Sequence, residues 1–457
     1  MKRKICVVLV LFMLFTLCVG SLAQAAPQGG QADACKMYNS FVGQATDKAG
    51  CSIQNQVARK QQTGDIYEYS LTLKVGPGSY DKIGLHRVAR ERAPWIPVPA
   101  RNAVMMIHGD TCNFDMGFAT PNPSQESLAI YLAQQGVDVW GIDLRWALVP
   151  DTTADFSFMK NWNTALYLKD IQTAVQVCRS VRFLTGGGFD KVILLGHSRG
   201  AQLSYSYANQ QTALPEGLQD VKGIIPIDLA YKLNLNDYPN DPVAQAIKQG
   251  AQTRYNTLKA LYTSGTYDDN GGVMMKGLSG LAAVAPNVYS QYNPVMTNLQ
   301  FALAALTATY MSATPQMPAA TPFFHYLAGT FDPGTQLPTG LQFADQNYIL
   351  SIGMATPSFQ SIGEQIDGDA ILSDKQTPYD NHLRQIKIPV FYIGAGGGFG
   401  QYGANTLKFL GSTDKETLII NTFPTMPVLD YGHADLLWAS NAEGQVWNPI
   451  AKWIAAH

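Results

Sequence analysis

Short apolar runs alternate with helical patterns over the first half of the chain. Residues 66–75 and 83–90 alternate apolar and polar positions on either side of Gly76-Pro77-Gly78, which predicts an antiparallel pair of strands. Continuous apolar runs predict buried strands at 103–107, 137–142, 192–195 and 221–227. Helical patterns lie between these runs at 125–135 and 166–184. Such alternation predicts the α/β class, with a mostly parallel central sheet and helices on both faces.

The alternation of strand and helix patterns stops after residue 230, and strand patterns return near residue 388. Residues 231–385 contain Ala-, Leu-, Met- and Tyr-rich helical stretches such as Leu299–Met311, without alternating strands. Apolar strand patterns return at 388–393 and 417–422, and a helix is predicted at 434–455. Because the sheet resumes, we interpret 231–385 as a helical cap inserted over the strand ends. A separate helical domain is the alternative.

The N-terminus has the pattern of a targeting segment. A basic start, Met1–Lys4, precedes an apolar stretch from Ile5 to Val19, and Ala23-Gln24-Ala25 resembles a small-residue cleavage site. The apolar stretch is short for a membrane span. We therefore predict a signal peptide at 1–25, a secreted or periplasmic protein, and no stable membrane anchor after cleavage. An N-terminal extension at 26–62 then precedes the core, which comprises 63–230 and 386–457.

The distribution of charged residues argues against a nucleic-acid partner. The chain has 457 residues, of which 46% are hydrophobic and 14% charged, and its formal net charge is −2. No Lys/Arg cluster follows the N-terminus, so we expect no nucleic-acid partner. The His and Cys residues are scattered without the spacing of a metal site, so we expect no metal and no cofactor. The sequence does not determine the oligomeric state.

Four cysteines remain after the predicted cleavage: Cys35, Cys51, Cys112 and Cys178. Cys35 and Cys51 flank a short polar segment, and in an oxidising compartment a disulfide between them is expected. Cys112 and Cys178 fall in predicted core regions, either paired or as buried free thiols.

The most informative segment is Gly196-His197-Ser198-Arg199-Gly200, which directly follows the predicted strand at 192–195. A helix-compatible stretch comes next. Gly-x-Ser-x-Gly between a strand and a helix places the serine at a sharp, exposed turn, where the first helical N–H groups face any developing negative charge. Ser198 is therefore a candidate nucleophile.

This arrangement resembles the α/β-hydrolase superfamily over residues 65–230 and 386–457. The resemblance implies an oxyanion loop after an early strand, then the nucleophile, an acid and a late histidine in chain order. His433, between the last predicted strand and the last helix, stands where the resemblance puts the base. His197 is poorly placed to act on its own neighbour, and His325 and His382 would line the pocket or pack in the cap.

The acid departs from the family's commonest pattern. In most relatives it follows the strand at 388–393, but here that strand runs into a glycine-rich segment, Gly394–Gly400, without a carboxylate. A minority variant puts the acid one strand earlier, where Asp228 follows the 221–227 run. Asp228 is the preferred candidate, with an ordinary helix cap as the alternative role. Asp430 is the second candidate, and a Ser–His pair without an acid is the third.

His108-Gly109-Asp110 matches the family's oxyanion loop. The resemblance implies that the backbone N–H of Asp110, or that of Thr111, pairs with the N–H of Arg199. Gly398–Gly403 also fits G-x-G-x-x-G, but it lies too late in the chain for a dinucleotide-binding fold. We expect this segment to form a flexible loop beside the active site.

The resemblance thus implies a secreted serine hydrolase of the esterase or lipase type. Its triad would be Ser198, His433 and Asp228, and the apolar cap residues favour a small-molecule ester with an apolar portion. A peptidase or amidase of the same fold remains open, as do acyl transfer to an alcohol and a non-catalytic binding protein.

Overall fold

The computed structural model describes residues 31–457, so the predicted signal peptide lies outside the described residues. Eleven strands of this part form one sheet in the order β1-β3-β4-β7-β6-β8-β9-β14-β15, with β2 paired to β3 and β5 to β4. The strands are β1 (Ser52–Ile53), β2 (Ala58–Thr63), β3 (Ile66–Lys74), β4 (Lys82–Ala93), β5 (Ile96–Pro97), β6 (Ala103–Ile107), β7 (Asp138–Asp143), β8 (Val192–His197), β9 (Val221–Ile227), β14 (Val390–Ala395) and β15 (Lys415–Ile420).

The sheet is parallel from β7 to β15 and antiparallel at its N-terminal edge. Within residues 31–457, seven α-helices lie outside the segment at 231–385: α2 (Gln31–Ala49), α3 (Leu128–Gln134), α4 (Thr164–Leu184), α5 (Arg199–Gln211), α11 (Gly400–Ala404), α12 (Asp435–Trp438) and α13 (Asn448–Ala456). The central strands are buried on both faces, which explains their continuous apolar sequences.

Alternate side chains of each central strand enter different hydrophobic cores. Met105 and Leu194 pack with α2, α4 and α5, whereas Val104 and Leu195 pack with α3 and α13 on the opposite face. This separation follows from the two-residue period of a strand. The prediction of a mostly parallel sheet covered on both faces is confirmed.

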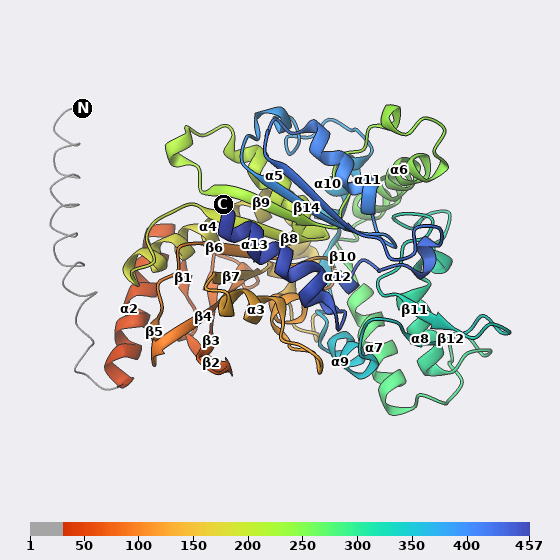
Figure 1. Cartoon of the computed structure of the whole chain (residues 1–457), viewed down its shortest axis with the longest axis horizontal. Helices are drawn as coiled ribbons and strands as arrows, with labels where there is room; N and C mark the ends of the chain where they lie inside the picture. Colours follow the sequence, from red (N-terminus) through yellow and green to blue (C-terminus); the bar gives the residue numbers. More distant parts are fainter. Residues whose placement is uncertain (1–30) are drawn as a thin grey trace.

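The segment at 231–385 lies on the right of the sheet in Figure 1. Its elements are α6 (Pro242–Thr263), β10 (Asp268–Asp269), α7 (Gly271–Val284), α8 (Asn298–Thr307), β11 (Gly329–Phe331), β12 (Pro338–Leu341), α9 (Gln346–Ala355), β13 (Gln360–Ser361) and α10 (Ile362–Leu372). The helical pattern at 299–311 corresponds to α8. The two short antiparallel pairs, β10–β13 and β11–β12, have no signal in the sequence pattern. We call this segment the cap.

The described part of the predicted extension at 26–62 differs from expectation, because it belongs to the core. Residues 31–49 form α2, whose Tyr38, Val42 and Ala45 are buried against the sheet, and β1 and β2 pair with β3.

The predicted Cys35–Cys51 disulfide is wrong. All four cysteines of the described chain are free. Cys35 lies near the start of α2 and Cys51 just beyond its end, so a helical rise of about 21 Å from residue 35 to residue 49 separates them, far beyond the reach of a disulfide.

The predicted C-terminal helix at 434–455 is interrupted after Trp438. Ser440 donates its backbone N–H to the carbonyl of Phe343 in the cap (2.7 Å), and Ala439 is extended. This contact with the cap draws the chain out of the helix. Among residues 31–457, no helix combines the length and apolar character needed to cross a bilayer.

Candidate active site

Ser198 occupies a strained turn between β8 and α5. Its φ of 55° and ψ of −120° lie in a region that residues other than glycine rarely adopt. Neighbouring glycines permit this turn: a Cβ on Gly196 would lie 2.1 Å from the carbonyl oxygen of Gly200, and one on Gly200 would lie 1.9 Å from that of Ile107. The Gly-x-Ser-x-Gly pattern therefore forms the strand–turn–helix arrangement that presents a serine hydroxyl.

His433 and Asp228 meet although 205 positions separate them. His433 lies on the loop between β15 and α12, and its Nδ1 is 2.7 Å from Oδ2 of Asp228. Asp228 directly follows β9 and is fully buried, with a φ of 47°. Because a carboxylate only accepts, Nδ1 of His433 donates to it, which leaves Nε2 free to accept a proton.

The glycine-rich turn after β14 surrounds the Asp228 carboxylate. Oδ1 accepts N–H hydrogen bonds from Ala395 (3.0 Å), Phe399 (3.1 Å) and Gly400 (3.2 Å). A Cβ on Gly398 would lie 1.9 Å from Oδ2. The flexible loop expected here is thus a buried cradle, which sequence reasoning missed. Its signal was the run of glycines where an acid was expected.

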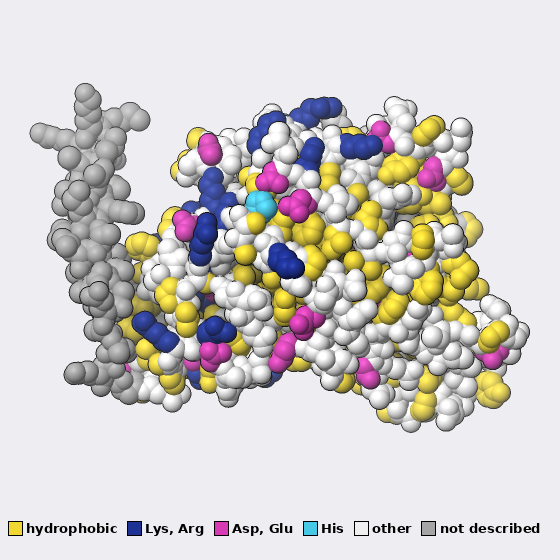
Figure 2. Space-filling view, viewed as in Figure 1, with side chains coloured by type: hydrophobic (Ala, Val, Ile, Leu, Met, Phe, Trp, Pro, Cys, Tyr) yellow, Lys and Arg dark blue, Asp and Glu magenta, His cyan; other side chains and the backbone are white. Residues whose placement is uncertain are grey.

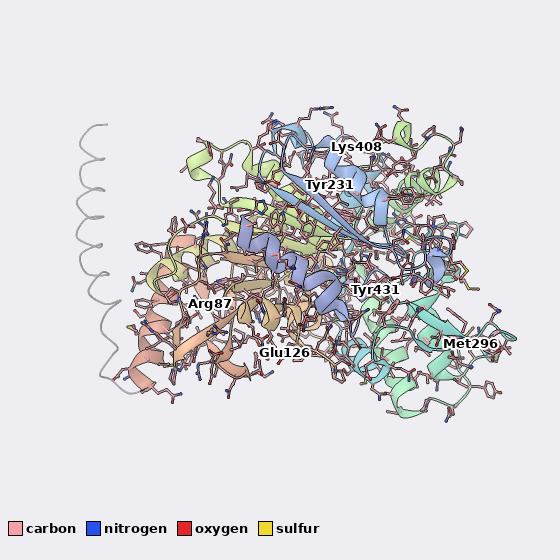
Figure 3. The ribbon with its side chains drawn as sticks, viewed as in Figure 1. Arg87, Glu126, Tyr231, Met296, Lys408 and Tyr431 are labelled. Atoms are coloured by element: carbon pink, nitrogen blue, oxygen red, sulfur yellow. The ribbon has the colours of Figure 1, made fainter. Side chains whose placement is uncertain are left out.

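Asp430, the second candidate acid, is engaged elsewhere. Its Oδ1 accepts the N–H groups of Thr422 and Tyr431, each at 2.7 Å. These bonds shape the loop that carries His433. Tyr431 is labelled in Figure 3, close to the junction of α12 with the cap.

Aromatic rings surround His433, which is 3% exposed. Its ring lies 4.5 Å from that of His197, the residue before Ser198, and 5.1 Å from that of Phe324. Nε2 of His197 donates to the carbonyl of His433 (3.1 Å), and burial lowers the pKa of His197 well below its usual value. A neutral His197 thus holds the loop of His433 by a single N–H.

The loop after β6 packs directly against Ser198. A Cβ on Gly109 would lie 2.9 Å from Cβ of Ser198. His108 is buried and fixed, because its Nε2 accepts the N–H of Leu144 (3.0 Å) and its Nδ1 therefore donates to the carbonyl of Gly109 (3.0 Å). Burial lowers the pKa of His108, in agreement with a neutral ring.

The N–H groups of Asp110 and Arg199 have no acceptor within residues 31–457, whereas that of Thr111 donates to Oε1 of Gln360 (3.1 Å). Of the two predicted loop donors, Asp110 is therefore the one left free. Its carboxylate pairs with the Arg199 guanidinium at 3.1 Å, so its charge is compensated.

His325 packs inside the structure. Its ring is fully buried, with Nδ1 2.9 Å from the carbonyl of Phe323 and Nε2 2.8 Å from that of Asp430. Backbone bonds from His433 to His325 (3.0 Å) and from Ala434 to Tyr326 (2.7 Å) join the cap to the His433 loop. His382 lies near the C-terminal end of the cap, where its N–H donates to the side chain of Asn209 (2.7 Å).

Two groups of side chains in the described chain bring three potential metal ligands within 4.8 Å of one another. In the first, Glu68, His86 and Asp115, the imidazole has no free nitrogen, because Nδ1 lies 2.8 Å from Glu68 and Nε2 lies 2.9 Å from Asp143. The second, Asp414, Glu416 and His457, is at the surface. Neither group includes Ser198 or His433.

No family model matches the chain, and no curated protein matches its sequence. Solved structures do match its fold. A candidate lipase from Sulfolobus solfataricus has a TM-score of 0.58 and 17% identity, over 89% of this chain and 99% of that chain. This chain has the α/β-hydrolase fold.

Two further structures align with lower TM-scores. A metagenome-derived lipolytic enzyme has a TM-score of 0.32 and 16% identity, over 79% of this chain and 96% of that one. A candidate epoxide hydrolase from Pseudomonas aeruginosa has a TM-score of 0.38 and 13% identity, over 89% and 97%. It is the match to the Sulfolobus solfataricus structure, with its TM-score of 0.58, that confirms the resemblance drawn from Ser198 and its surroundings, at the level of the α/β-hydrolase fold.

Proposed function

We propose that this protein is a serine hydrolase that cleaves carboxylic esters through an acyl-enzyme. The observation that carries the proposal is the 2.7 Å hydrogen bond between His433 and the buried Asp228, beside the strained turn of Ser198. The base is thereby oriented by an acid and lies against the residue that precedes the nucleophile.

In the proposed reaction, Oγ of Ser198 attacks the ester carbonyl while Nε2 of His433 takes the hydroxyl proton. Asp228 stabilises the imidazolium, and the N–H groups of Asp110 and Arg199 stabilise the oxyanion. His433 then protonates the leaving alcohol as the C–O bond breaks. Water attacks the acyl-enzyme by the same route, with His433 again as the base, and releases the acid and free Ser198.

The cap supports a substrate with an apolar portion. Residues 277–331 contain no Asp, Glu, Lys or Arg. Large apolar side chains are exposed there, including Val284 (80%), Tyr289 (70%) and Met311 (75%). In Figure 2 the lower right of the molecule, where Figure 1 places α7 and α8, shows mainly hydrophobic and uncharged side chains, a few acidic ones, and no Lys or Arg. An apolar ester therefore suits this surface better than a charged one. The targeting pattern at 1–25 supports a secreted or periplasmic location.

The first test is labelling with a fluorophosphonate, which reports an activated serine without assuming a substrate. We expect one adduct, on the peptide that contains Ser198, and none in Ser198→Ala. Labelling in Asp228→Asn should be about 10⁴-fold slower, because an amide would favour the wrong tautomer of the base.

Two matched variants complete this test. Ser204→Ala removes a buried serine of the same helix, and Asp430→Asn keeps the oxygen that accepts from Thr422 and Tyr431. Both should be labelled at nearly the wild-type rate. Absence of an adduct in folded wild-type protein would overturn the proposed function, and slow labelling of Asp430→Asn with normal labelling of Asp228→Asn would move the acid to Asp430.

A further inference from the structure

Gln360 lies in the cap but contacts the loop that follows β6. It belongs to the short strand β13, where it pairs with Asp269 of β10, and its side chain is fully buried. About 250 positions of sequence separate it from the loop residues that it touches.

The Gln360 amide uses both of its ends. Oε1 accepts the backbone N–H of Thr111 at 3.1 Å. Nε2 donates to Oδ1 of Asp110 and to Oε1 of Glu364, the latter at 3.1 Å. The orientation of the amide is unambiguous, because Thr111 N–H requires an acceptor and the Asp110 carboxylate requires a donor.

These bonds determine which loop N–H is free. Gln360 occupies the N–H of Thr111, and the N–H of Asp110 is left without an acceptor in the described chain. The loop also needs support, because Thr111 has a φ of 55°, a conformation that costs free energy for a residue other than glycine. The Arg199 guanidinium donates to both oxygens of the Asp110 carboxylate, to Oδ1 at 3.1 Å and to Oδ2 at 3.3 Å. Asp110 is thus fixed between the nucleophile helix and the cap.

We propose that Gln360 is a positioning residue for the oxyanion loop, holding the Asp110 N–H where the carbonyl oxygen of the substrate becomes negative. The inference rests on the proposed function and goes beyond it by assigning part of the oxyanion hole to the cap. Gln360 acts through Asp110 and Thr111 and does not itself touch the substrate.

The test compares Gln360→Met with Gln365→Met. Gln365 is also a buried cap glutamine, but it donates to Asp269 (3.1 Å) instead of the loop. With p-nitrophenyl butyrate, Gln360→Met should lower kcat by about 10- to 100-fold and leave KM within about threefold, because the oxyanion forms only in the transition state. Gln365→Met should retain the wild-type kcat.

Gln360→Glu supplies a readout that a purely structural role would not change. In this variant an ionised carboxylate at position 360 cannot donate to Asp110 and would repel it. The protonated carboxyl group, in contrast, donates an O–H to Asp110 and still accepts from Thr111. The ratio of the variant's kcat to that of the wild type should therefore rise as the pH falls. Taking the ratio at each pH cancels the titration of groups that do not contact position 360.

The outcomes separate this inference from the proposed function. A wild-type protein that is neither labelled nor active would overturn both. An active wild type with unchanged kcat in Gln360→Met would overturn only the role of Gln360, as would a raised KM with unchanged kcat. If Gln360→Met fails to fold, the near-isosteric Gln360→Glu decides alone, and a ratio that stays flat or falls with decreasing pH would overturn the inference.

Discussion

Gly398 allows the sharpest test of the Asp228 cradle. An alanine Cβ at this position would lie 1.9 Å from Oδ2 of Asp228, and side-chain Cβ atoms essentially never approach another atom within 3.0 Å. The carboxylate or the turn must therefore shift by at least about 1.1 Å, the difference between these two distances. Oδ2 is also the atom that accepts from His433 at 2.7 Å, so this displacement acts directly on the proposed base.

The size of the effect follows from how strongly catalysis depends on the orientation of the histidine. A misplacement of about 1 Å can cost about 10²-fold in rate, and loss of the correct histidine tautomer costs about 10⁴-fold in serine proteases. Gly398→Ala should therefore lower kcat, and the rate of fluorophosphonate labelling, by about 10²- to 10⁴-fold. KM should change little, because Asp228 is buried and does not face the substrate.

The assay compares Gly398→Ala with Gly444→Ala, a substitution at a glycine whose added Cβ would meet no atom within 4 Å. Circular dichroism first establishes that both variants are folded. Initial rates of p-nitrophenyl butyrate hydrolysis and labelling rates are then measured for both. A folded Gly398→Ala protein with kcat within about fivefold of the wild type would refute the argument that Asp228 orients His433.

Three further predictions concern stability. Burial raises the pKa of Glu364 from 4.5 to about 8. This shift corresponds to roughly 5 kcal/mol of stability that is present at low pH and is lost as the pH rises from 4.5 to about 8. Glu364→Gln should therefore raise Tm at about pH 9 and leave it nearly unchanged at about pH 4, and equal shifts in Tm at both pH values would contradict this. Asp138 is 2% exposed and pairs with Arg87 (2.8 Å) and Arg182 (3.0 Å). Asp138→Asn leaves two buried guanidinium groups without a full counter-charge, so it should lower the free energy of unfolding, measured by urea titration, by about 3–5 kcal/mol. A loss below about 1 kcal/mol would contradict the importance of this ion-pair network. Because Cys35 and Cys51 are free, dithiothreitol should leave Tm unchanged, and a marked decrease would indicate the disulfide that the structure lacks.

The sheet could be predicted because each central strand is fully buried. Residues 103–107 and 221–227 are continuous apolar runs, and the strands β6 and β9 have these same bounds. Helix α2 was missed although its signal is present. Ala34, Tyr38, Val42 and Ala45 recur at helical spacing and are all buried, but small polar residues between them obscure the pattern.

The residues of the candidate site differ in how easily the sequence alone reveals them. Ser198 has a local motif, and His433 has a position relative to the last strand. Gln360 has neither, because its proposed role depends on a contact across about 250 positions, and a single glutamine carries no pattern. The break after Trp438 has the same origin, since it depends on Phe343 of the cap.

The position of Asp228 connects the unusual features of this site. β9 and β14 are parallel neighbours, with Ile227 opposite Ile393, so the ends of these strands lie about 5 Å apart. An acid after either strand can therefore reach a histidine on the loop after β15. Placing it after β9 leaves the end of β14 without an acid, and glycines there let the N–H groups of Ala395, Phe399 and Gly400 approach the buried carboxylate. Because these donors are backbone groups, the sequence indicates them only indirectly, through the glycines that lie among them. A glycine run where a carboxylate is expected is therefore a reason to look for the acid on the neighbouring strand.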